Sequence, residues 1–247
     1  MQMNIQLPDL IASLNSGFRY LPTTFILSFV PLSAGLVFGT LIALVQVFKV
    51  PVLRKIFAVF VSIYSGIPSV VALLIYNLLY ITQFNKIAAF FGSSLTVREV
   101  SPIYVALFTF SLSSIVLMSE TIRGALLSID KGQFEAGYSV GLTTRQILRR
   151  IVLPQVVPVI LPPLTNHVVG SIKNTSIVMT IGVMDVLNGA IVPAETTYRF
   201  LEGYIASALI YWAVNALLEF LLRRLETHTG KFRNTECTDS ATEYKND

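Results

Sequence analysis

The sequence has little charge, one cysteine and very few histidines. Only 13% of its 247 residues are Asp, Glu, Lys or Arg, whereas 53% are hydrophobic and the mean hydropathy is +0.68. A water-soluble core of this length does not need such values, so we expect an integral membrane protein. With Cys237, His167 and His228 as its whole supply, the chain cannot build a disulfide framework or a cysteine/histidine metal cluster. These absences exclude redox and metal chemistry, and no converging nucleophile and base suggest a catalytic site.

Five stretches are apolar and long enough to cross a membrane as helices, which takes about 20 residues each. We expect these spans at about 20–48, 56–81, 103–127, 156–187 and 200–222. The fourth contains Pro158, Pro162 and Pro163, so we expect shorter or kinked helices there. The first is too long for the apolar region of a signal peptide, and no convincing cleavage site follows it. The sequence therefore predicts an all-α membrane protein with five transmembrane helices.

Positive charge gathers on one side of the expected spans. That side carries Lys49, Arg54 and Lys55, the basic residues of 131–150 and those of 223–233. The opposite side has fewer basic residues, and the acids Asp9, Glu99 and Glu195 dilute them. The positive-inside rule then places the N-terminus outside and the C-terminus in the cytoplasm of a multi-pass cell-membrane protein. The net charge of +4 follows from this topology and gives no reason to expect a nucleic-acid partner.

The chain divides into a membrane domain and a tail. The membrane domain covers 1–228, and the tail covers 229–247. The tail is polar and mixed in charge, so we expect it to be disordered in the cytoplasm. No internal repeat is visible.

A polar insert, 130–155, interrupts the apolar chain on the expected cytoplasmic side. Asp130 can cap a first helix, and Gly141 suits the left-handed residue that ends such a helix. Thr143 and Gln146 form a capping box for a second helix, which we expect Pro154 to stop. Taken alone, this pattern is also that of an amphipathic helix at the membrane interface.

The insert and several motifs around it resemble the permeases of ABC importers, in particular their polar amino acid uptake branch. The stretch Glu135-Ala136-Gly137, with Gly141 and Ile151-Val152-Leu153-Pro154-Gln155 after it, is similar to the EAA motif of that superfamily. Further motifs occur in the family's order: Ser119-Glu120-Thr121-Ile122-Arg123-Gly124, Lys173-Asn174-Thr175-Ser176, Ile181-Gly182-Val183 and Ile210-Tyr211-Trp212. The resemblance runs from about residue 15 to residue 228 and implies the MetI-like ABC permease fold, with a cytoplasmic EAA coupling-helix loop.

Two positions depart from the family pattern. Gly137 stands where the family more often has alanine, a difference that we expect to matter little. Ser65-Gly66-Ile67-Pro68 stands where the family often has Arg-Gly-Thr-Pro, so a charge near the pathway is missing here.

The resemblance implies that the insert fits a groove on a cytoplasmic ATP-binding subunit. The residues implied in this coupling are Glu135, Ala136, Gly137, Gly141 and Pro154. The chain lacks a glycine-rich loop followed by Lys-Ser or Lys-Thr, so we expect ATP and Mg²⁺ on the partner, with no cofactor and no enzymatic activity in this chain. A second permease, identical or closely related, and an extracytoplasmic solute-binding protein complete the implied importer, which works by alternating access.

Polar residues at membrane depth mark the candidate substrate pathway. Glu120 and Arg123 are three apart on a helix, so they can form an ion pair or hold a substrate or a neighbouring subunit. Four consecutive polar residues interrupt the fourth apolar run, which favours a pathway role over bonding back to the helix. These residues are Lys173, Asn174, Thr175 and Ser176.

Two further positions are open to more than one interpretation. Gly66 and Pro68 predict a break in the second span, which is either a simple kink or a hinge whose half-helix end faces an ion. His167 has no matched acid in the sequence, so we expect a structural polar contact rather than a proton relay.

The choice of substrate depends on one substitution. Many permeases of the branch have Lys-Asp-Thr-Ser where this chain has Lys173-Asn174-Thr175-Ser176, and the neutral Asn174 offers no full charge to a cationic side chain. The resemblance therefore favours L-cystine, followed by glutamine, glutamate or another polar amino acid. A secondary transporter without an ATPase partner is the alternative of a different class, although such proteins usually show inverted repeats and more spans.

Overall fold

The computed structural model describes residues 5–243, with side chains described for residues 5–224. The N-terminal half consists of α1 (Leu7–Arg19), α2 (Leu21–Ala34), a π-helical turn η1 (Gly35–Gly39), α3 (Thr40–Val47), α4 (Leu53–Ser65), α5 (Ser69–Phe90) and α6 (Ile103–Leu127). The C-terminal half consists of α7 (Lys131–Ser139), α8 (Thr144–Ile147), a π-helical turn η2 (Leu148–Val152), α9 (Leu153–Asn174), a 3₁₀ helix η3 (Thr175–Ile181), α10 (Val186–Thr197) and α11 (Phe200–Glu243).

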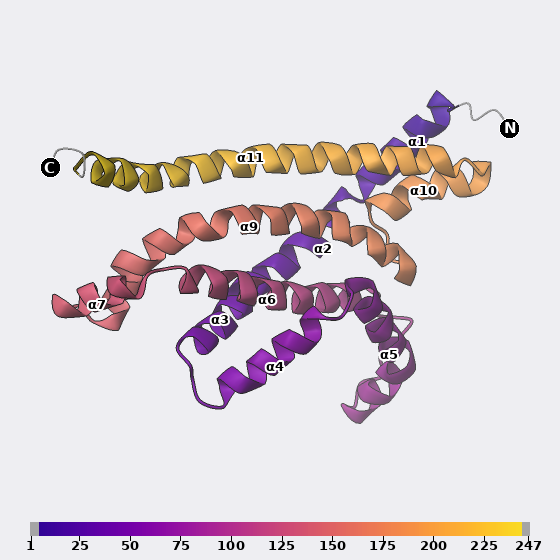
Figure 1. The fold of residues 1–247 in the computed structure, drawn as a ribbon. Coiled ribbons are helices and arrows are strands. Elements are labelled where there is room, and N and C mark those ends of the chain that lie inside the picture. The colour runs from indigo at the N-terminus through magenta and orange to yellow at the C-terminus, as the bar shows by residue number, and fades with distance from the viewer. Residues whose placement is uncertain (1–4, 244–247) are drawn as a thin grey trace.

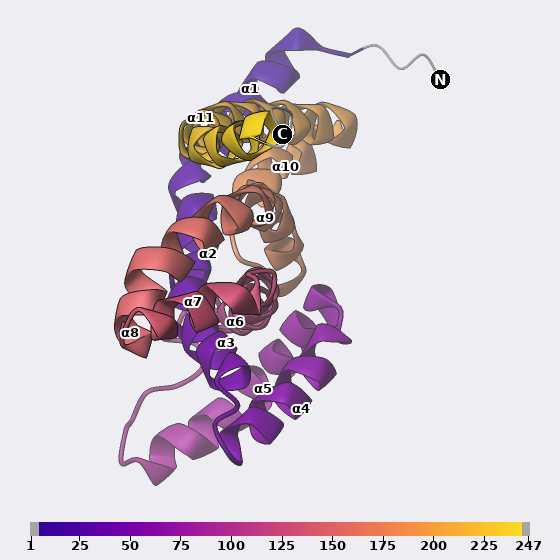
Figure 2. The same cartoon turned by 60° about the vertical axis from the view of Figure 1, so that its left-hand side comes forward.

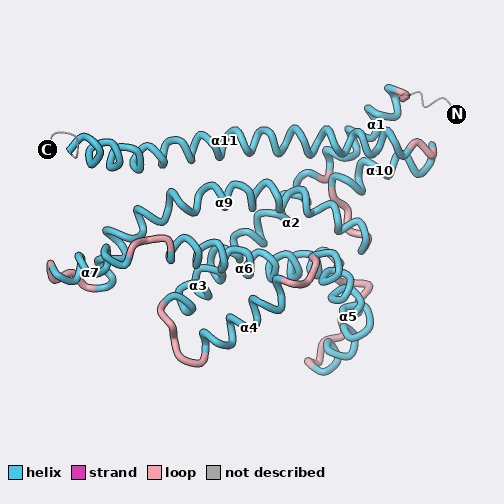
Figure 3. The backbone as a smooth tube through the Cα atoms, viewed as in Figure 1, coloured by secondary structure: helices cyan, strands magenta, loops and turns pink. Residues whose placement is uncertain are grey.

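The helices are stacked in tiers, with α10 and α11 on one side, α9 and α6 in the middle, and α4 and α5 on the other side (Figure 1). The continuous rod of α2, η1 and α3 crosses these tiers and packs against α6 and α9. The view turned by 60° keeps this order and shows α7 and α8 together beside α6 (Figure 2). The connections lie mainly at the two ends of the bundle (Figure 3). Five helical stretches of the described chain are long and apolar enough to span a membrane, which confirms the expected fold class and number of spans.

Helix α6 is the centre of the packing, because α2, η1, α3, α4, α5 and α9 all contact it. Its closest neighbour is η1, where Gly35 and Gly39 face the α6 backbone and side chains. A Cβ atom on Gly35 would lie 2.8 Å from the Ser114 carbonyl oxygen, and one on Gly39 would lie 2.8 Å from Cβ of Met118. Small residues four apart therefore allow the two helices to approach closely, as is common in membrane bundles.

The break that the sequence predicts in the second span is present. The apolar run 56–81 is divided into α4 and α5, which are separated by Gly66, Ile67 and Pro68. Pro68 is the N-cap of α5, with φ −58° and ψ 136°, and its ring disfavours a helical conformation at the preceding residue, Ile67. The candidate membrane span is consequently Ser69–Phe90, and α4 is a separate helix that packs against α3 and α6.

The expected fourth span is divided into α9 and η3, as the prediction of shorter helices has it, but the division at Asn174 does not lie at the prolines. Helix α9 continues through Pro158, Pro162 and Pro163 as one 22-residue element. The expectation that Pro154 stops the preceding helix is wrong, since α8 passes through η2 directly into α9. Pro154 lies in the first turn of α9, where its missing N–H is tolerated, and the wider π turn precedes its ring.

An N-terminal helix and a short helix before the last span form a unit that the sequence analysis did not anticipate. Helices α1, α10 and α11 pack against one another, and Arg199 bridges Asp9 at 3.3 Å and Glu202 at 3.5 Å. Where α10 begins, the fully buried Asp185 is its N-cap, and the Asp185 carboxylate accepts a hydrogen bond of 2.6 Å from the Tyr211 hydroxyl. This buried carboxylate joins the start of α10 to α11.

Helix α11 continues to Glu243, across the boundary that the sequence predicts at residue 228. Helical hydrogen bonds are local, so a polar segment can extend a helix that an apolar segment has already started. Residues 244–247 of the expected tail lie outside the described residues, and the state of the tail in solution stays a prediction.

Candidate functional site

The coupling segment, 130–155, folds into two short helices joined by a glycine turn at one end of the bundle (Figure 1). Asp130 is the N-cap of α7, and its carboxylate accepts a hydrogen bond of 2.9 Å from the Gly132 amide. Thr143 and Gln146 form the predicted capping box of α8. Gly141 has φ +80°, a left-handed conformation that a residue with a Cβ rarely adopts. The predicted caps at Asp130 and Thr143 and the predicted turn at Gly141 are therefore confirmed.

Two faces of the coupling segment differ in exposure. Glu135 and Ala136 are exposed on α7, as a docking surface requires, and Tyr138 is exposed beside them. On the other face, Ile147 and Val152 are fully buried against Ala125 of α6 and Val156 of α9. The segment thus presents a polar surface outward while an apolar cluster fixes it to two membrane helices.

Gly137 is the point where the two short helices touch. It is buried, and a Cβ atom there would lie 2.6 Å from Cγ1 and 2.8 Å from Cδ1 of Ile147. Glycine at this position therefore permits close packing, because even a methyl group would have to displace the Ile147 side chain; the expectation that glycine instead of alanine matters little stays a prediction. The Tyr138 and Thr144 hydroxyls, 3.1 Å apart, add a polar contact between α7 and α8, and the side-chain amide of Gln155 in α9 donates to the side-chain oxygen of Gln133 in α7 at 3.2 Å.

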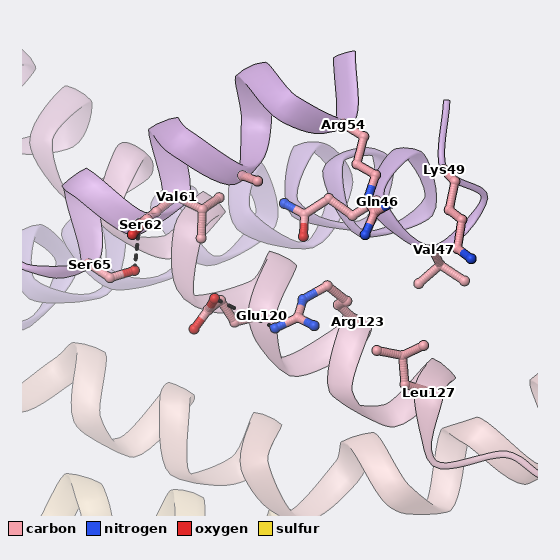
Figure 4. A pocket seen from close by; sticks show the side chains of 11 residues that line it. Gln46, Val47, Lys49, Arg54, Val61, Ser62, Ser65, Glu120, Arg123 and Leu127 are labelled. Carbon is pink, nitrogen blue, oxygen red and sulfur yellow. Dashed lines mark hydrogen bonds and ion pairs between the residues drawn. The ribbon is translucent and has the colours of Figure 1, made fainter. Parts of the chain in front are cut away.

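A basic chamber of about 550 Å³ lies between α3, α4 and α6, and Figure 4 shows its lining side chains. Glu120 and Arg123 line it from α6, opposite Arg54 and Gln46, and Ser62 and Ser65 line it from α4 (Figure 4). The Arg123 guanidinium is 3.8 Å from the Glu120 carboxylate, so the two residues do form the ion pair that the sequence allows. Glu120 remains 51% and Arg123 37% exposed, which leaves both groups accessible from the chamber.

Two smaller cavities continue from the basic chamber toward α9. The serine pocket, of about 250 Å³, shares Ser65 and Glu120 with the chamber and includes Ser69 and Ser113. The central cavity, of about 290 Å³, shares Ser69 and Ser113 with the serine pocket. Asn174 lines the central cavity from the end of α9. Three neighbouring cavities, each sharing lining residues with the next, therefore lie between Arg123 at one end and Asn174 at the other, beside the break at Gly66 and Pro68.

The four polar residues at 173–176 do not act together. Asn174 lines the central cavity, whereas Lys173 is exposed and lines none of the described cavities. Thr175 is buried, donates to the Ile172 carbonyl at 2.8 Å and lies 3.4 Å from the Tyr211 hydroxyl. The Ser176 hydroxyl donates back to the Lys173 carbonyl at 2.9 Å. Only Asn174 of this group has the placement expected of a pathway residue.

Several cavity residues could not be recognised from the sequence motifs. His167 lines the central cavity and is hydrogen-bonded to the Thr121 hydroxyl at 2.8 Å, which agrees with a structural polar contact. The residues that the sequence analysis missed are Ser69, Ser113, Ser114 and Asn166 around the two inner cavities, and Lys49 and Arg54 around the basic chamber. The sequence signal for these residues was weak, because they are serines and an asparagine within apolar helices, or basic residues that membrane topology already explains.

Comparison with known proteins agrees with this architecture. Residues 35–231 match the family described as binding-protein-dependent transport system inner membrane component. The chain is 35% identical over 213 residues to the L-cystine transport system permease protein TcyL of Bacillus subtilis, covering 86% of each chain. It is 32% identical over 200 residues to the glutamine transport system permease protein GlnP of Escherichia coli, covering 81% of this chain and 86% of that one. Among solved structures, that of an amino acid ABC transporter with histidines matches with a TM-score of 0.77 and 25% identity, covering 92% of this chain and all of that one.

Proposed function

Since this chain belongs to the family of binding-protein-dependent transport system inner membrane components and is an amino-acid ABC transporter permease, we propose that its polar cavities carry a polar amino acid inward. The single observation that supports this role most is the row of three cavities, each sharing lining residues with the next, between Asn174 and Arg123 in a bundle that carries the coupling segment at one end. A permease of this kind needs two parts, a route for the substrate through the membrane and a docking surface for a separate ATP-binding subunit.

In this proposal the energy comes from a separate ATP-binding subunit that docks on α7. The exposed Glu135 and Ala136 form the contact surface, and the Gly137–Ile147 contact passes its movement to α6 and α9. ATP and Mg²⁺ bind to that subunit, and the present chain transmits force by packing. A secondary transporter would not need such a segment.

The break between α4 and α5 is the proposed hinge of the route. Ser65 lies before Gly66 and Pro68, and Ser69 lies after them; the two serines line successive cavities. A change of backbone angles at these residues would open one cavity while it closes the other, as alternating access requires.

The proposed transporter is assembled from several chains. A second permease, identical or related, completes the membrane part, and an extracytoplasmic solute-binding protein delivers the substrate. The coupling segment and the C-terminal end of α11 lie toward the same end of the bundle, opposite the N-terminus (Figure 1). We propose that this end faces the cytoplasm, because it carries the basic connection 49–55 and the basic residues of 131–150.

The proposed substrate is L-cystine, with glutamine as the second candidate. The L-cystine permease TcyL and the glutamine permease GlnP are similarly identical in sequence to this chain, at 35% and 32%, so sequence identity alone does not decide between the two substrates. Asn174 favours a substrate without a net positive side chain, because it offers hydrogen bonds but no carboxylate in the central cavity.

Two measurements test the proposal. A tagged form of this chain should co-purify with an ATP-binding subunit, and cells that express the whole transporter should take up radiolabelled L-cystine in competition with glutamine and arginine. Uptake dominated by arginine would refute the proposal that Asn174 disfavours cationic side chains. Uptake dominated by glutamine would overturn only the assignment of cystine as the substrate. Transport that persists without any ATP-binding subunit would refute the proposed coupling.

A further inference from the structure

The basic chamber contains more positive than negative charge. Lys49, Arg54 and Arg123 line it against a single carboxylate, Glu120. Membrane topology explains why basic residues occur in the connection between α3 and α4, but it does not require that they converge with Arg123 on one cavity. The chamber therefore combines space and positive charge in a way that needs its own explanation.

Two of the three cations lack a counter-ion. Within residues 5–224, the ion pairs join Arg123 to Glu120, Arg199 to Asp9 and Glu202, and Arg223 to Glu219; none includes Lys49 or Arg54. Even the Arg123–Glu120 pair is loose, at 3.8 Å. Positive groups that share a partly enclosed cavity repel one another, so an anion that enters the chamber is attracted by all three.

The backbone between α3 and α4 adopts strained conformations where it carries these cations. Lys49 has φ 53°, and Val52 has φ 65° with ψ −58°; both φ angles are positive although neither residue is glycine and Val52 is β-branched. The turn is nevertheless well bonded, since the Val50 amide donates to the Val45 carbonyl at 3.1 Å and the Arg54 amide donates to the Val50 carbonyl at 3.1 Å. Strain of this kind persists where the surrounding structure imposes it, and it gathers at functional sites.

The size and position of the chamber fit a small solute. Its volume of about 550 Å³ is within the range of ligand pockets, and Ser65 and Glu120 continue it into the serine pocket. The proposed substrates all carry a carboxylate, and cystine carries two. A carboxylate that leaves the neutral central cavity would next meet Arg123, Arg54 and Lys49, whereas a cationic side chain would be repelled there.

We propose that the basic chamber is an oxyanion site that receives a carboxylate of the transported amino acid on its way to the cytoplasm and rejects cationic side chains. This inference rests on the proposed importer function, and it assigns part of the substrate selection to the permease itself. Lys49, Arg54 and Arg123 hold the carboxylate, and Glu120 can meet the substrate's ammonium group.

The charge of the chamber can be measured without knowing the substrate. Cys237 is the single cysteine of the sequence, so Cys237→Ser gives a cysteine-free chain into which Ser62→Cys is introduced as a probe that lines the chamber. The complex of this chain with its ATP-binding subunit is placed in nanodiscs of neutral phosphatidylcholine. The rates of modification by an anionic sulfonatoethyl and a cationic trimethylammonioethyl methanethiosulfonate are then compared. We expect the ratio of anionic to cationic rates to be about tenfold higher at Ser62→Cys than at Ser94→Cys, an exposed position in the connection between α5 and α6.

Matched variants assign this ratio to the chamber. The double variant Lys49→Gln and Arg54→Gln should bring the ratio at Ser62→Cys close to that at Ser94→Cys. Lys55→Gln removes one charge from the same connection but does not line the chamber, so it should leave the ratio almost unchanged. Similar ratios at Ser62→Cys and Ser94→Cys in the parent chain would overturn the proposal.

Two further measurements test whether the anion that binds in the chamber is the carboxylate of the substrate or a lipid phosphate. In uptake by the whole transporter, arginine should compete several-fold better against cystine in the Lys49→Gln and Arg54→Gln variant than in the parent, with Lys55→Gln unchanged; no change in this competition would overturn the selection role. If phosphatidylglycerol in the nanodiscs abolishes the anionic preference at Ser62→Cys, the chamber is a lipid phosphate site and the carboxylate assignment falls. A parent transporter without ATP-dependent uptake would instead overturn the proposed function, and the labelling ratio would still decide whether the chamber attracts anions.

Discussion

The coupling segment and the basic chamber are both polar regions of an apolar protein, but they are built in opposite ways. In the coupling segment, caps at Asp130 and Thr143 fix the helix ends, and Ile147 and Val152 are fully buried beneath them. In the basic chamber, the ion pair is long, and Lys49 and Arg54 have no carboxylate partner within residues 5–224. A part that transmits force has to be rigid, whereas a part that passes a solute has to keep its polar groups available.

This difference between the coupling segment and the basic chamber implies that loss of buried packing in the segment should reduce transport function more than loss of a polar group in the cavities. Ile147→Ala should have the largest effect, because it removes a fully buried side chain from the cluster on α6 and α9 at a cost of about 2–5 kcal/mol of local stability. Substrate-stimulated ATP hydrolysis by the assembled transporter should fall strongly, and hydrogen exchange in α7 and α8 should become faster. Unchanged protection of α7 and α8 would show that the cluster does not hold the segment.

The contact between Gly137 and Ile147 sharpens this prediction. Gly137→Ala alone should destabilise the segment by about 1–3 kcal/mol through overpacking, since its methyl group would lie 2.6 Å from Cγ1 of Ile147. In the double variant Gly137→Ala and Ile147→Ala the clash is absent, so the combined loss should be smaller than the sum of the single losses. Strict additivity in the ATPase or exchange measurement would contradict the contact.

The glycine turn should be next in effect. Gly141→Val places a β-branched residue at φ +80° and should cost about 1–2 kcal/mol, which loosens the link between α7 and α8. Gly141→Asn is the matched control, because asparagine tolerates left-handed backbone better than valine. Equal substrate-stimulated ATPase in the two variants would mean that the left-handed turn at Gly141 is not needed to couple ATP hydrolysis to transport.

Changes in the cavities should alter selectivity more than stability. Asn174→Asp adds a carboxylate to the central cavity without changing its size, so arginine should compete better with cystine for uptake, by about tenfold or less. Lys173→Gln is the control, since Lys173 is exposed and lines none of the described cavities. A larger change in the control than in Asn174→Asp would remove Asn174 from the route.

The Glu120–Arg123 pair should show the smallest effect. Both groups are more than a third exposed and 3.8 Å apart, so a double-mutant cycle with alanine should give a coupling below about 1 kcal/mol in stability. The charge-swapped pair Glu120→Arg and Arg123→Glu should restore part of what either alanine variant loses in transport. A swapped pair as poor as the worse single variant would indicate that the two residues serve separate partners.

The sequence predicted best those features that depend on neighbouring residues. The cap at Asp130, the box of Thr143 and Gln146, and the turn at Gly141 each need only a few residues of context, and all three are present. The number of spans also followed from composition, because apolar length is a local property. The break at Gly66 and Pro68 was predicted as well, but the bounds of the second span were not, since hydropathy is continuous across these residues while the helix is interrupted.

Features that depend on distant residues could not be predicted in this way. The contact of Gly137 with Ile147 and the convergence of Lys49, Arg54 and Arg123 join segments whose relative placement only the fold decides. The prediction for Pro154 failed for a similar reason, because Pro154 falls in the first turn of α9, directly after the π turn η2, where its missing N–H is tolerated. Thr175 was assigned to the pathway from its polarity, although its hydroxyl is buried near Tyr211.

The central claim, that α7 docks on the ATP-binding subunit, is tested most directly by reversing one exposed charge on it. Glu135→Arg leaves the buried contacts of the segment intact and changes only the proposed docking surface. Glu195→Arg, the same change at an exposed position of α10, is the control. Substrate-stimulated ATPase of the reconstituted transporter should fall at least tenfold for Glu135→Arg and remain near the parent value for Glu195→Arg. Equal stimulation in both variants and the parent would contradict the docking of α7.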